Sequence, residues 1–390
     1  MISVAEALAH IFDLVAPLPT EEVALEDAAG RVLAAPVIAR RDQPPFAASA
    51  MDGYAVTAAD ARPGASLGVI GTSAAGHGFD GTLAPGQAVR IFTGAPVPPG
   101  ADRVIIQEDV MRDGDRITLG DRLDSAAHIR PAGADFACGD TLSAPRRLRP
   151  ADLALAAAMN VPRVTAHRRP RVAIIATGDE LVMPGETPGP DQIIAANGFA
   201  LTAMAEAEGA RAQMLPIARD TEASLRAVFA QARDADLILT IGGASVGDHD
   251  LVGKVAADLG LNQSFYKVAM RPGKPLMAGR LGDATMIGLP GNPVSALVCA
   301  HVFVLPAIRV MQGLPAEPAP ASRAPVACDL PANGPRAHYM RARIIDGRLV
   351  PFDSQDSALL TILSEARALI VRAPHEGPRQ AGERVDYLPL

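Results

Sequence analysis

Strand-like and helix-like patterns alternate along residues 171–311, and this alternation limits the possible folds of the chain more than any other feature. The apolar runs RVAIIATG, ADLILTIGG and ATMIGLPG end in glycines and are separated by stretches with helical periodicity. In one of these stretches, TEASLRAVFAQAR, apolar residues recur at i, i+3, i+4 and i+7 from Leu225, which is the spacing of a helix that covers a sheet. Residues 169–313 are therefore expected to form a doubly wound α/β domain with a parallel sheet.

Two further regions flank this α/β domain. Residues 1–168 have amphipathic helical patterns near both ends, and from about 42 to 140 short apolar runs alternate with Gly, Pro and Asp. This texture predicts an N-terminal α+β region with a nested β-rich insert. A Pro/Ala linker follows the α/β domain at 314–325, and residues 326–390 predict a small C-terminal domain that is β-barrel-like.

Composition argues against several classes of protein. The 390 residues are 49% hydrophobic, which is enough for several packed cores. Aromatic residues make up only 4%, tryptophan is absent and the net charge is −7, so no nucleic-acid partner is expected. The three cysteines are far apart without a CxxC pair, which indicates neither a disulfide framework nor a zinc knuckle. Because there is no basic leader and no long uncharged apolar run, we expect a cytoplasmic protein without a membrane segment.

Polar and glycine-rich turns follow the predicted strands of the α/β domain. In a doubly wound sheet, ligands bind beyond the carboxyl ends of the strands, so these turns are expected to meet at one edge. Helix N-caps and tight turns use the same residue types. Any one of these turns taken alone is therefore explained equally well by a purely structural role. The residues expected at a binding site in these turns are Thr177, Gly178, Asp179, Glu180, Asp220, Gly242, Gly243, Ser245, Asp250, Pro290, Gly291, Asn292 and Pro293.

Two kinds of ligand are suggested by this set. The carboxylates of Glu180, Asp220 and Asp250 are candidate ligands for Mg²⁺ beside a phosphate-like anion. The turn GLPGNPVSA, residues 288–296, is a candidate anion site, because its prolines and glycines make it rigid and sharply bent. A helix that begins near Pro293 would present unpaired amides and the positive end of its dipole to such an anion.

Basic residues gather in the stretch FYKVAMRPGKP. On an extended strand, alternation places Lys267 and Arg271 on the same face, and Lys274 follows in a Gly-Pro turn. This face is expected to meet an anion, although an exposed edge strand protected by lysine has the same pattern.

Six stretches resemble the MoeA family of molybdopterin molybdenumtransferases, which includes the C-terminal domain of gephyrin. They are, in order, MDGYAV, TGAPVPPGAD, ATGDEL, GGASVGDHD, RPGKP and GLPGNPVSA, and the similarity covers nearly the whole chain. Judged by their residues alone, the first two stretches are turns between apolar runs with a structural role.

The resemblance implies an enzyme that inserts molybdate into adenylylated molybdopterin, releases AMP and completes the molybdenum cofactor in a Mg²⁺-dependent step. A separate MogA-type adenylyltransferase would supply the substrate. The resemblance also implies an elongated homodimer with its active cleft between the subunits. Since the α/β domain is MogA-like, a MogA-like adenylyltransferase is one alternative function, and a gephyrin-like scaffold protein is the other.

Matching the family's functional positions to this chain adds residues to the expected site. The expected catalytic residues are Asp52, Thr93, Glu180, Asp220, Asp250, Lys267 and Arg271, with Glu180, Asp220 and Asp250 as metal ligands. Asp52 and Thr93 match residues that the partner subunit offers, and Lys274 and Ser357 join the expected binding residues. Many relatives carry lysine where this chain has Arg271, which keeps the charge and changes the donor geometry.

Overall fold

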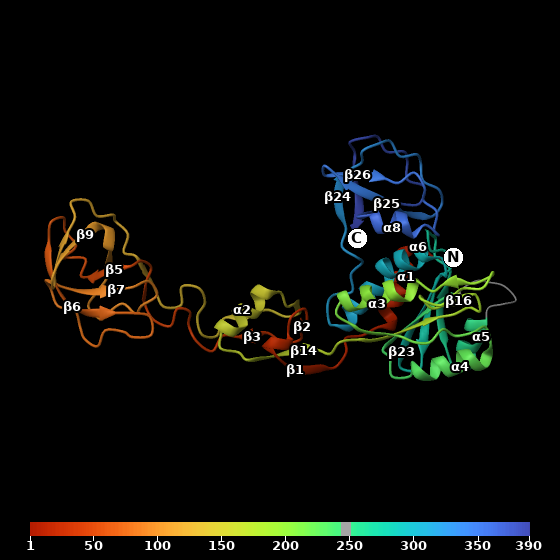
Figure 1. Cartoon of the computed structure of the whole chain (residues 1–390), viewed down its shortest axis with the longest axis horizontal. Coiled ribbons are helices and arrows are strands. Elements are labelled where there is room, and N and C mark those ends of the chain that lie inside the picture. The colour runs from red at the N-terminus through yellow and green to blue at the C-terminus, as the bar shows by residue number, and fades with distance from the viewer. Residues whose placement is uncertain (243–250) are drawn as a thin grey trace.

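The structure is a computed structural model that describes residues 1–242 and 251–390. The molecule is elongated: a β domain at one end is joined by a slender stalk to an α/β domain, and the C-terminal domain lies beside the α/β domain (Figure 1). The predicted α/β multidomain architecture is therefore confirmed.

The α/β domain contains a six-stranded sheet in the order β18-β15-β19-β23-β22-β20. Its parallel strands are β15 (Arg171–Ala176), β18 (Arg211–Met214), β19 (Leu237–Ile241) and β23 (Ala284–Leu289). The strands β22 (Met277–Leu281) and β20 (Asn262–Tyr266) complete the other edge in antiparallel pairing. The sequence did not predict this antiparallel edge, which arises because only two residues, the first being Gly282 at φ +59°, connect β22 to β23.

Helices cover both faces of this sheet, as predicted for a doubly wound fold. On one face lie α3 (Asn197–Ala207), α6 (Pro293–Cys299) and α7 (Leu305–Met311), the last two joined by the π-helical segment Ala300–Val304. On the other face lie α4 (Glu222–Gln231) and α5 (Leu251–Asp258). The helical stretch Pro293–Met311 is long and apolar enough to cross a membrane, but 83% of its apolar window is buried inside the protein, as in the core helix of a globular domain.

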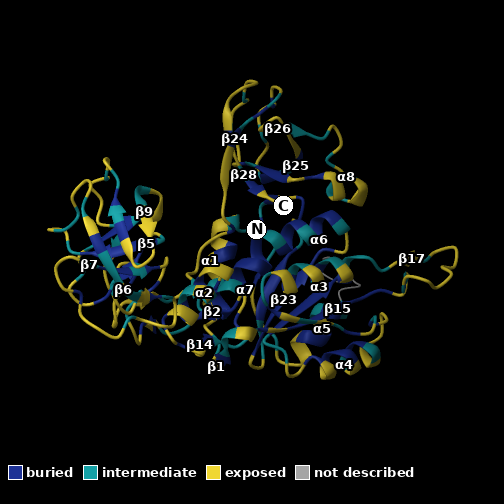
Figure 2. Ribbon diagram, turned by 60° about the vertical axis from the view of Figure 1, so that its left-hand side comes forward, coloured by how far each residue is buried: buried dark blue, intermediate teal, exposed yellow. Residues whose placement is uncertain are grey.

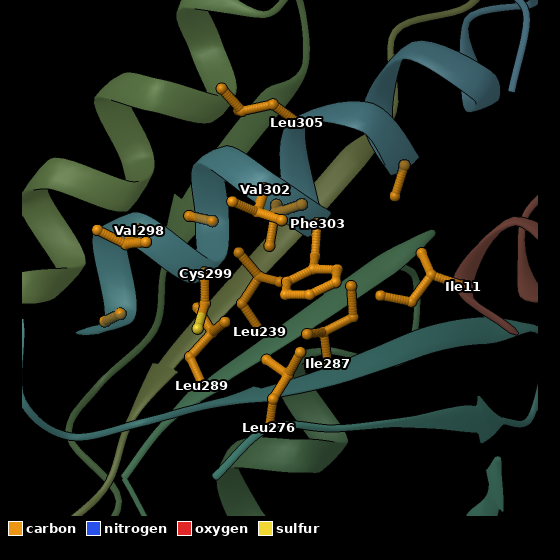
Figure 3. Packing of buried hydrophobic residues seen from close by; sticks show 14 of the residues in the cluster. Ile11, Leu239, Leu276, Ile287, Leu289, Val298, Cys299, Val302, Phe303 and Leu305 are labelled. Atoms are coloured by element: carbon orange, nitrogen blue, oxygen red, sulfur yellow. The ribbon is translucent and has the colours of Figure 1, made fainter. Parts of the chain in front are cut away.

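The first helix of the chain, α1 (Val4–Leu14), packs on the α/β domain. A capping box between Ser3 and Glu6 begins it. Its buried residue Ile11 reaches the same cluster as Leu239 and Ile287 of the sheet (Figure 3). The sequence predicts one N-terminal region over residues 1–168, whereas the chain starts in the α/β domain, leaves it to form the stalk and the β domain, and then returns.

The stalk and the β domain are together called the arm (residues 20–167). The stalk sheet has the order β1-β14-β2-β13. Its strands are β1 (Thr20–Ala24), β14 (Arg163–His167), β2 (Val32–Leu33) and β13 (Arg146–Arg147), and α2 (Pro150–Ala158) packs on them. Two short strand pairs, β3 (Val37–Ile38) with β12 (Thr141–Leu142) and β4 (Ala48–Ser49) with β11 (Ile129–Arg130), lead to the β domain.

The β domain is the predicted nested insert, and its sheet has the order β8-β5-β7-β6-β10-β9. The strands are β5 (Gly53–Val56), β6 (Ser66–Ser73), β7 (Gln87–Ile91), β8 (Arg103–Ile106), β9 (Val110–Asp113) and β10 (Arg116–Leu119). One detail of the prediction is wrong, because most of MDGYAV is not a turn but the buried strand β5. Gly53 is required there, since a Cβ atom would lie 1.9 Å from the carbonyl oxygen of Ile105 on β8.

The C-terminal domain is a small barrel, as predicted. It contains β24 (Ser322–Pro325), β25 (Ala337–Ile345), β26 (Arg348–Pro351), β27 (Ala368–Arg372) and β28 (Arg384–Pro389), with α8 (Leu360–Glu365) between β26 and β27. A bridge between Val326 and Leu349 closes it. The last four residues of the predicted linker pair with β28 as β24, so the linker is shorter than expected. A two-residue strand of the α/β domain, β21 (Met270–Arg271), extends the barrel sheet by pairing with β25.

Candidate functional site

A cavity of about 460 Å³ lies at the carboxyl ends of β15 and β19, beside the first residues of α3 and α6. A flap that contains β16 (Leu181–Val182) and β17 (Ile193–Ile194) forms one wall and projects from the domain with mostly exposed residues (Figure 2). The cavity brings together six residues that the sequence predicted at a binding site: Thr177, Glu180, Gly242, Gly291, Asn292 and Pro293. Its apolar residues include Leu181, Ile193, Ile194 and Leu360.

The floor of this cavity is a close contact between the turns after two neighbouring strands. The hydroxyl of Thr177 donates to the carbonyl oxygen of Ile241 over 3.2 Å, and the Gly242 amide donates to Leu289 over 3.1 Å. Gly242 has φ +90°, and a Cβ atom there would lie 3.0 Å from the Thr177 carbonyl oxygen. Glycine is therefore needed for both the backbone angle and the close approach.

Carboxylates surround the turn after β15. The Asp220 amide donates to Asp179 Oδ1 over 3.1 Å, and the Asp179 amide donates to Asp220 Oδ2 over 3.4 Å. Arg219, which the sequence did not single out, donates to the carbonyl oxygens of residues 178, 179 and 181 and fixes this turn. The Glu180 side chain lies over Gly178, where a Cβ atom would meet its carboxylate at 2.2 Å.

Three predicted residues, Gly243, Ser245 and Asp250, lie outside the described residues. The predicted metal ligands that the structure describes are Glu180 and Asp220, and both are exposed. Within residues 1–242 and 251–390, no group of three His, Cys, Asp or Glu side chains is arranged to hold a metal ion.

The turn before α6 is anchored from the C-terminal domain. Pro293 occupies the first turn of α6 as predicted, with Asn292 as its N-cap. The Asn292 side chain donates to the hydroxyl of Ser357 over 3.0 Å, which brings a second predicted residue to this turn. The carbonyl oxygen of Ser357 accepts the Val294 amide over 3.1 Å, so one of the helix amides expected to be free for an anion is already used.

The predicted basic face is wrong in its geometry. Strand β20 ends at Tyr266, and Lys267 has φ +71°, which breaks the extended alternation. The chain turns here because it crosses to the C-terminal barrel, where Arg271 pairs with His338. Lys267 Nζ lies 5.1 Å from the centre of the Tyr266 ring, and Lys274 is an exposed residue of the following turn.

Arg271 lines a second cavity, of about 540 Å³, whose other lining residues all belong to the C-terminal barrel. The buried residues His338 and Arg372 line the same cavity. Residues 353–356 line it as well, while Ala358 and Leu360 line the first cavity. The segment 353–360 therefore forms a wall that the two cavities share, with Ser357 at its centre.

Burial lowers the pKa of His338 from 6.5 to about 4, and the charge of Arg271 acts in the same direction. The folded protein thus favours the neutral imidazole, and the stability this provides is complete above pH 6.5 and is lost as the pH falls towards 4. We expect His338→Gln to lose less unfolding free energy than the wild type between pH 7 and pH 5, measured by denaturant titration at both values. Equal losses in the two proteins would show that His338 does not carry this dependence.

The shared wall rests on a fully buried arginine that the sequence did not indicate. Arg341, on β25, donates through Nη1 to the Asp356 carbonyl oxygen over 2.6 Å. Its amide, Nε and Nη2 all donate to Gln355 Oε1, at 2.9, 3.2 and 3.1 Å. The Gln355 amide nitrogen returns hydrogen bonds to the carbonyl oxygens of Arg341 and Phe352. The contacts of Arg341 join residues 14 and 15 positions apart, so no local pattern signals them.

Gln355→Ala should destabilise the C-terminal barrel by about 2 kcal/mol or more, because it leaves donors of a buried guanidinium unpaired. The amides of residues 353–357 should also exchange with solvent faster. Calorimetry and hydrogen exchange measure the two effects, and Gln380→Ala, at an exposed position of the same domain, is the matched control. If the two variants behaved alike, the buried network would not hold the wall.

The β domain brings the two predicted residues Asp52 and Thr93 into contact. The Asp52 carboxylate accepts the Thr93 amide over 2.7 Å and the Thr93 hydroxyl over 2.8 Å. These hydrogen bonds lower the pKa of Asp52, and the charge of Arg90 acts in the same direction. The pair lies in the arm, far from both cavities within one chain, with the whole stalk between them (Figure 1).

Comparison with known families covers almost the whole chain in three consecutive parts. Residues 2–160 match the MoeA N-terminal region (domain I and II). Residues 173–310 match a probable molybdopterin binding domain, and residues 323–390 match the MoeA C-terminal region (domain IV).

Individual relatives agree with these matches. A molybdopterin molybdenumtransferase from Nostoc sp. is 39% identical over 80% of this chain and 75% of its own length. Molybdopterin molybdenumtransferase 2 from Mycobacterium tuberculosis is 37% identical over 89% of each chain. Among solved structures, a molybdopterin biosynthesis MoeA protein from Pyrococcus horikoshii superimposes with a TM-score of 0.86 at 27% identity, over the full length of both chains.

Proposed function

This chain belongs to the MoeA family of molybdopterin molybdenumtransferases, and we propose that it completes the molybdenum cofactor by inserting molybdate into adenylylated molybdopterin with release of AMP. The observation that carries the proposal is the cavity at the ends of β15 and β19, which gathers six of the predicted binding residues. Its mixture of an apolar wall and polar turns suits a ligand with a flat ring system and a charged linkage.

The second cavity supports a place for the oxyanion substrate. Arg271 and Arg372 line it, and the wall that carries Ser357 separates it from the first cavity. Molybdate is a dianion, and guanidinium groups bind oxyanions through charge-assisted hydrogen bonds. We infer that molybdate is held on the Arg271 side while the dithiolene sulfurs approach from the side of the first cavity, and that the arginines reduce the repulsion between the two anions.

Glu180, which lines the first cavity, and Asp220, beside the turn after β15, suit Mg²⁺ in the form in which it usually binds nucleotides. Mg²⁺ prefers oxygen ligands and usually takes one or two protein carboxylates together with substrate phosphates, so a closed cage of protein ligands is not needed. Glu180 and Asp220 supply hard oxygen atoms at exposed positions beside the turn after β15. When bound there, the ion would neutralise charge on the pyrophosphate linkage.

We further propose that the enzyme works as a homodimer in which the arm of one chain completes the cleft of the other. The support is that the Asp52–Thr93 pair belongs to the β domain, which the stalk separates from the α/β domain and the first cavity of the same chain. A two-fold dimer with paired clefts would bring each arm to the partner's strand ends.

The substrate is an adenylylated pterin, so a MogA-type adenylyltransferase is the expected supplying partner, and a cytoplasmic location is the expected setting. Incubation of the purified protein with adenylylated molybdopterin, Mg²⁺ and molybdate tests the proposed activity. AMP release with formation of active cofactor supports it. ATP consumption on bare molybdopterin would support the adenylyltransferase alternative. If neither reaction occurred, the scaffold role would be the remaining alternative.

A further inference from the structure

The two chain connections between the arm and the α/β domain lie along one side of the stalk. The chain enters the stalk at β1 and leaves it at β14, which are neighbours in the stalk sheet. Beside them, Arg168 forms a bidentate ion pair with Asp236 over 2.7 and 2.6 Å, and the Leu18 amide donates to the carbonyl oxygen of Met311. A rigid arm held only along this line would be free to rotate about it.

A third contact lies away from this line. Arg147 is on β13, the far edge of the stalk sheet, two strands and so about 10 Å from β14. It donates through Nη2 to Glu208 Oε1 over 2.7 Å and through Nη1 to the Glu208 carbonyl oxygen over 3.0 Å. Its Nη1 also lies 3.3 Å from the carbonyl oxygen of Gly30, which ties it to its own domain.

The acceptor of this contact is itself fixed inside the α/β domain. Glu208 is the C-cap of α3, and its side chain is only 12% exposed. Arg309 of α7 donates to both of its carboxylate oxygens, over 3.0 and 2.8 Å, and Gln312 donates to its carbonyl oxygen. An arginine at the C-terminal end of a helix also interacts favourably with the helix dipole.

Glycine makes the approach possible. Gly209, directly after Glu208, has φ +96° and ends the helix. A Cβ atom there would lie 2.7 Å from Gln312 Oε1 and 3.1 Å from Arg147 Nη1. The absence of a side chain at Gly209 therefore allows Arg147 of the arm to approach the backbone of the α/β domain.

We infer that Arg147 and Glu208 are positioning residues that lock the direction of the arm, so that Asp52 and Thr93 reach the cleft of the partner subunit. This inference rests on the proposed intersubunit cleft. Neither residue lines the first or the second cavity. Loss of their ion pair should therefore lower kcat by about fivefold or more and leave the KM for adenylylated molybdopterin unchanged within about twofold.

The chain carries natural probes for this direction. Cys138, in the arm, and Cys328, in the C-terminal domain, are exposed, while Cys299 is buried. Spin labels on the two exposed thiols report the distance between the arm and the rest of the chain, with labelled chains diluted in unlabelled chains so that distances within one chain dominate. We expect a narrow distance distribution for the wild type and a broad one for Arg147→Met and Glu208→Gln.

The matched control is Arg146→Met, because Arg146 pairs with Asp152 inside the stalk and should keep the narrow distribution. A narrow distribution in Arg147→Met and Glu208→Gln would overturn the inference, even if their thermal midpoints fell. Equal broadening in all three variants would also overturn it, since the effect would not depend on the contact between the arm and the α/β domain. The distances need no substrate, so a wild type that releases no AMP but shows the expected distances would refute the proposed function alone.

Discussion

Replacing Glu180 with glutamine should lower the rate of Mg²⁺-dependent AMP release by about a hundredfold or more while the protein stays folded. The exchange keeps the size of the side chain and removes the charge at the mouth of the first cavity, where the carboxylate lies over the turn after β15. Because Glu180 is exposed, its loss should cost little stability. The rate is measured by chromatography of released AMP over a range of Mg²⁺ concentrations.

The matched control is Glu186→Gln. Glu186 is an exposed carboxylate of the same flap that accepts the Met183 amide, and it does not line the cavity. It should retain nearly full activity. Wild-type turnover in a well-folded Glu180→Gln protein would show that this carboxylate takes no part in the reaction.

The second large effect should come from mixing two inactive variants. Asp52→Ala leaves every cleft without the carboxylate of the arm, and Glu180→Gln leaves every cleft without the carboxylate of the α/β domain. In a mixed dimer, one cleft takes Asp52 from the Glu180→Gln chain and Glu180 from the Asp52→Ala chain, so it is complete, while the other lacks both. Random reassociation makes half of the dimers mixed, and activity should recover to roughly a quarter of the wild-type value for a two-fold dimer.

The measurement is AMP release after the two variants are unfolded and refolded together, with each variant refolded alone as the baseline. Different affinity tags on the two chains confirm that subunits have exchanged. Absence of recovery despite proven exchange would mean that Asp52 does not act across a subunit boundary, and the proposal of a shared cleft would fail.

The parts of this molecule that could be predicted are those whose signals are local. The alternation of strands and helices in residues 171–311 predicted the sheet, and the strand-end turns predicted that Thr177, Glu180 and Asn292 gather at one cavity. Local sequence patterns are enough to predict this gathering, because the carboxyl ends of parallel strands lie at the same edge of the sheet.

The parts that could not be predicted depend on distant contacts. The left-handed angle at Lys267 arises where the chain crosses to the barrel, and a period-two pattern carries no sign of that crossing. The wall around Ser357 depends on Arg341, a charged residue that is fully buried, which sequence reasoning places on the surface by default. Arg147 and Glu208 are separated by 61 residues and by a domain boundary, so only the folded structure joins them.

The position of α1 has a consequence for the synthesis of the protein on the ribosome. The helix is made first, but the strands it packs on, β20 and β22, follow more than 200 residues later. At usual rates of translation this delay is tens of seconds, on the order of 10–60 s. During that time the arm can fold as a unit, while the apolar face of α1 has no native partner and is a natural target for a chaperone that holds nascent chains.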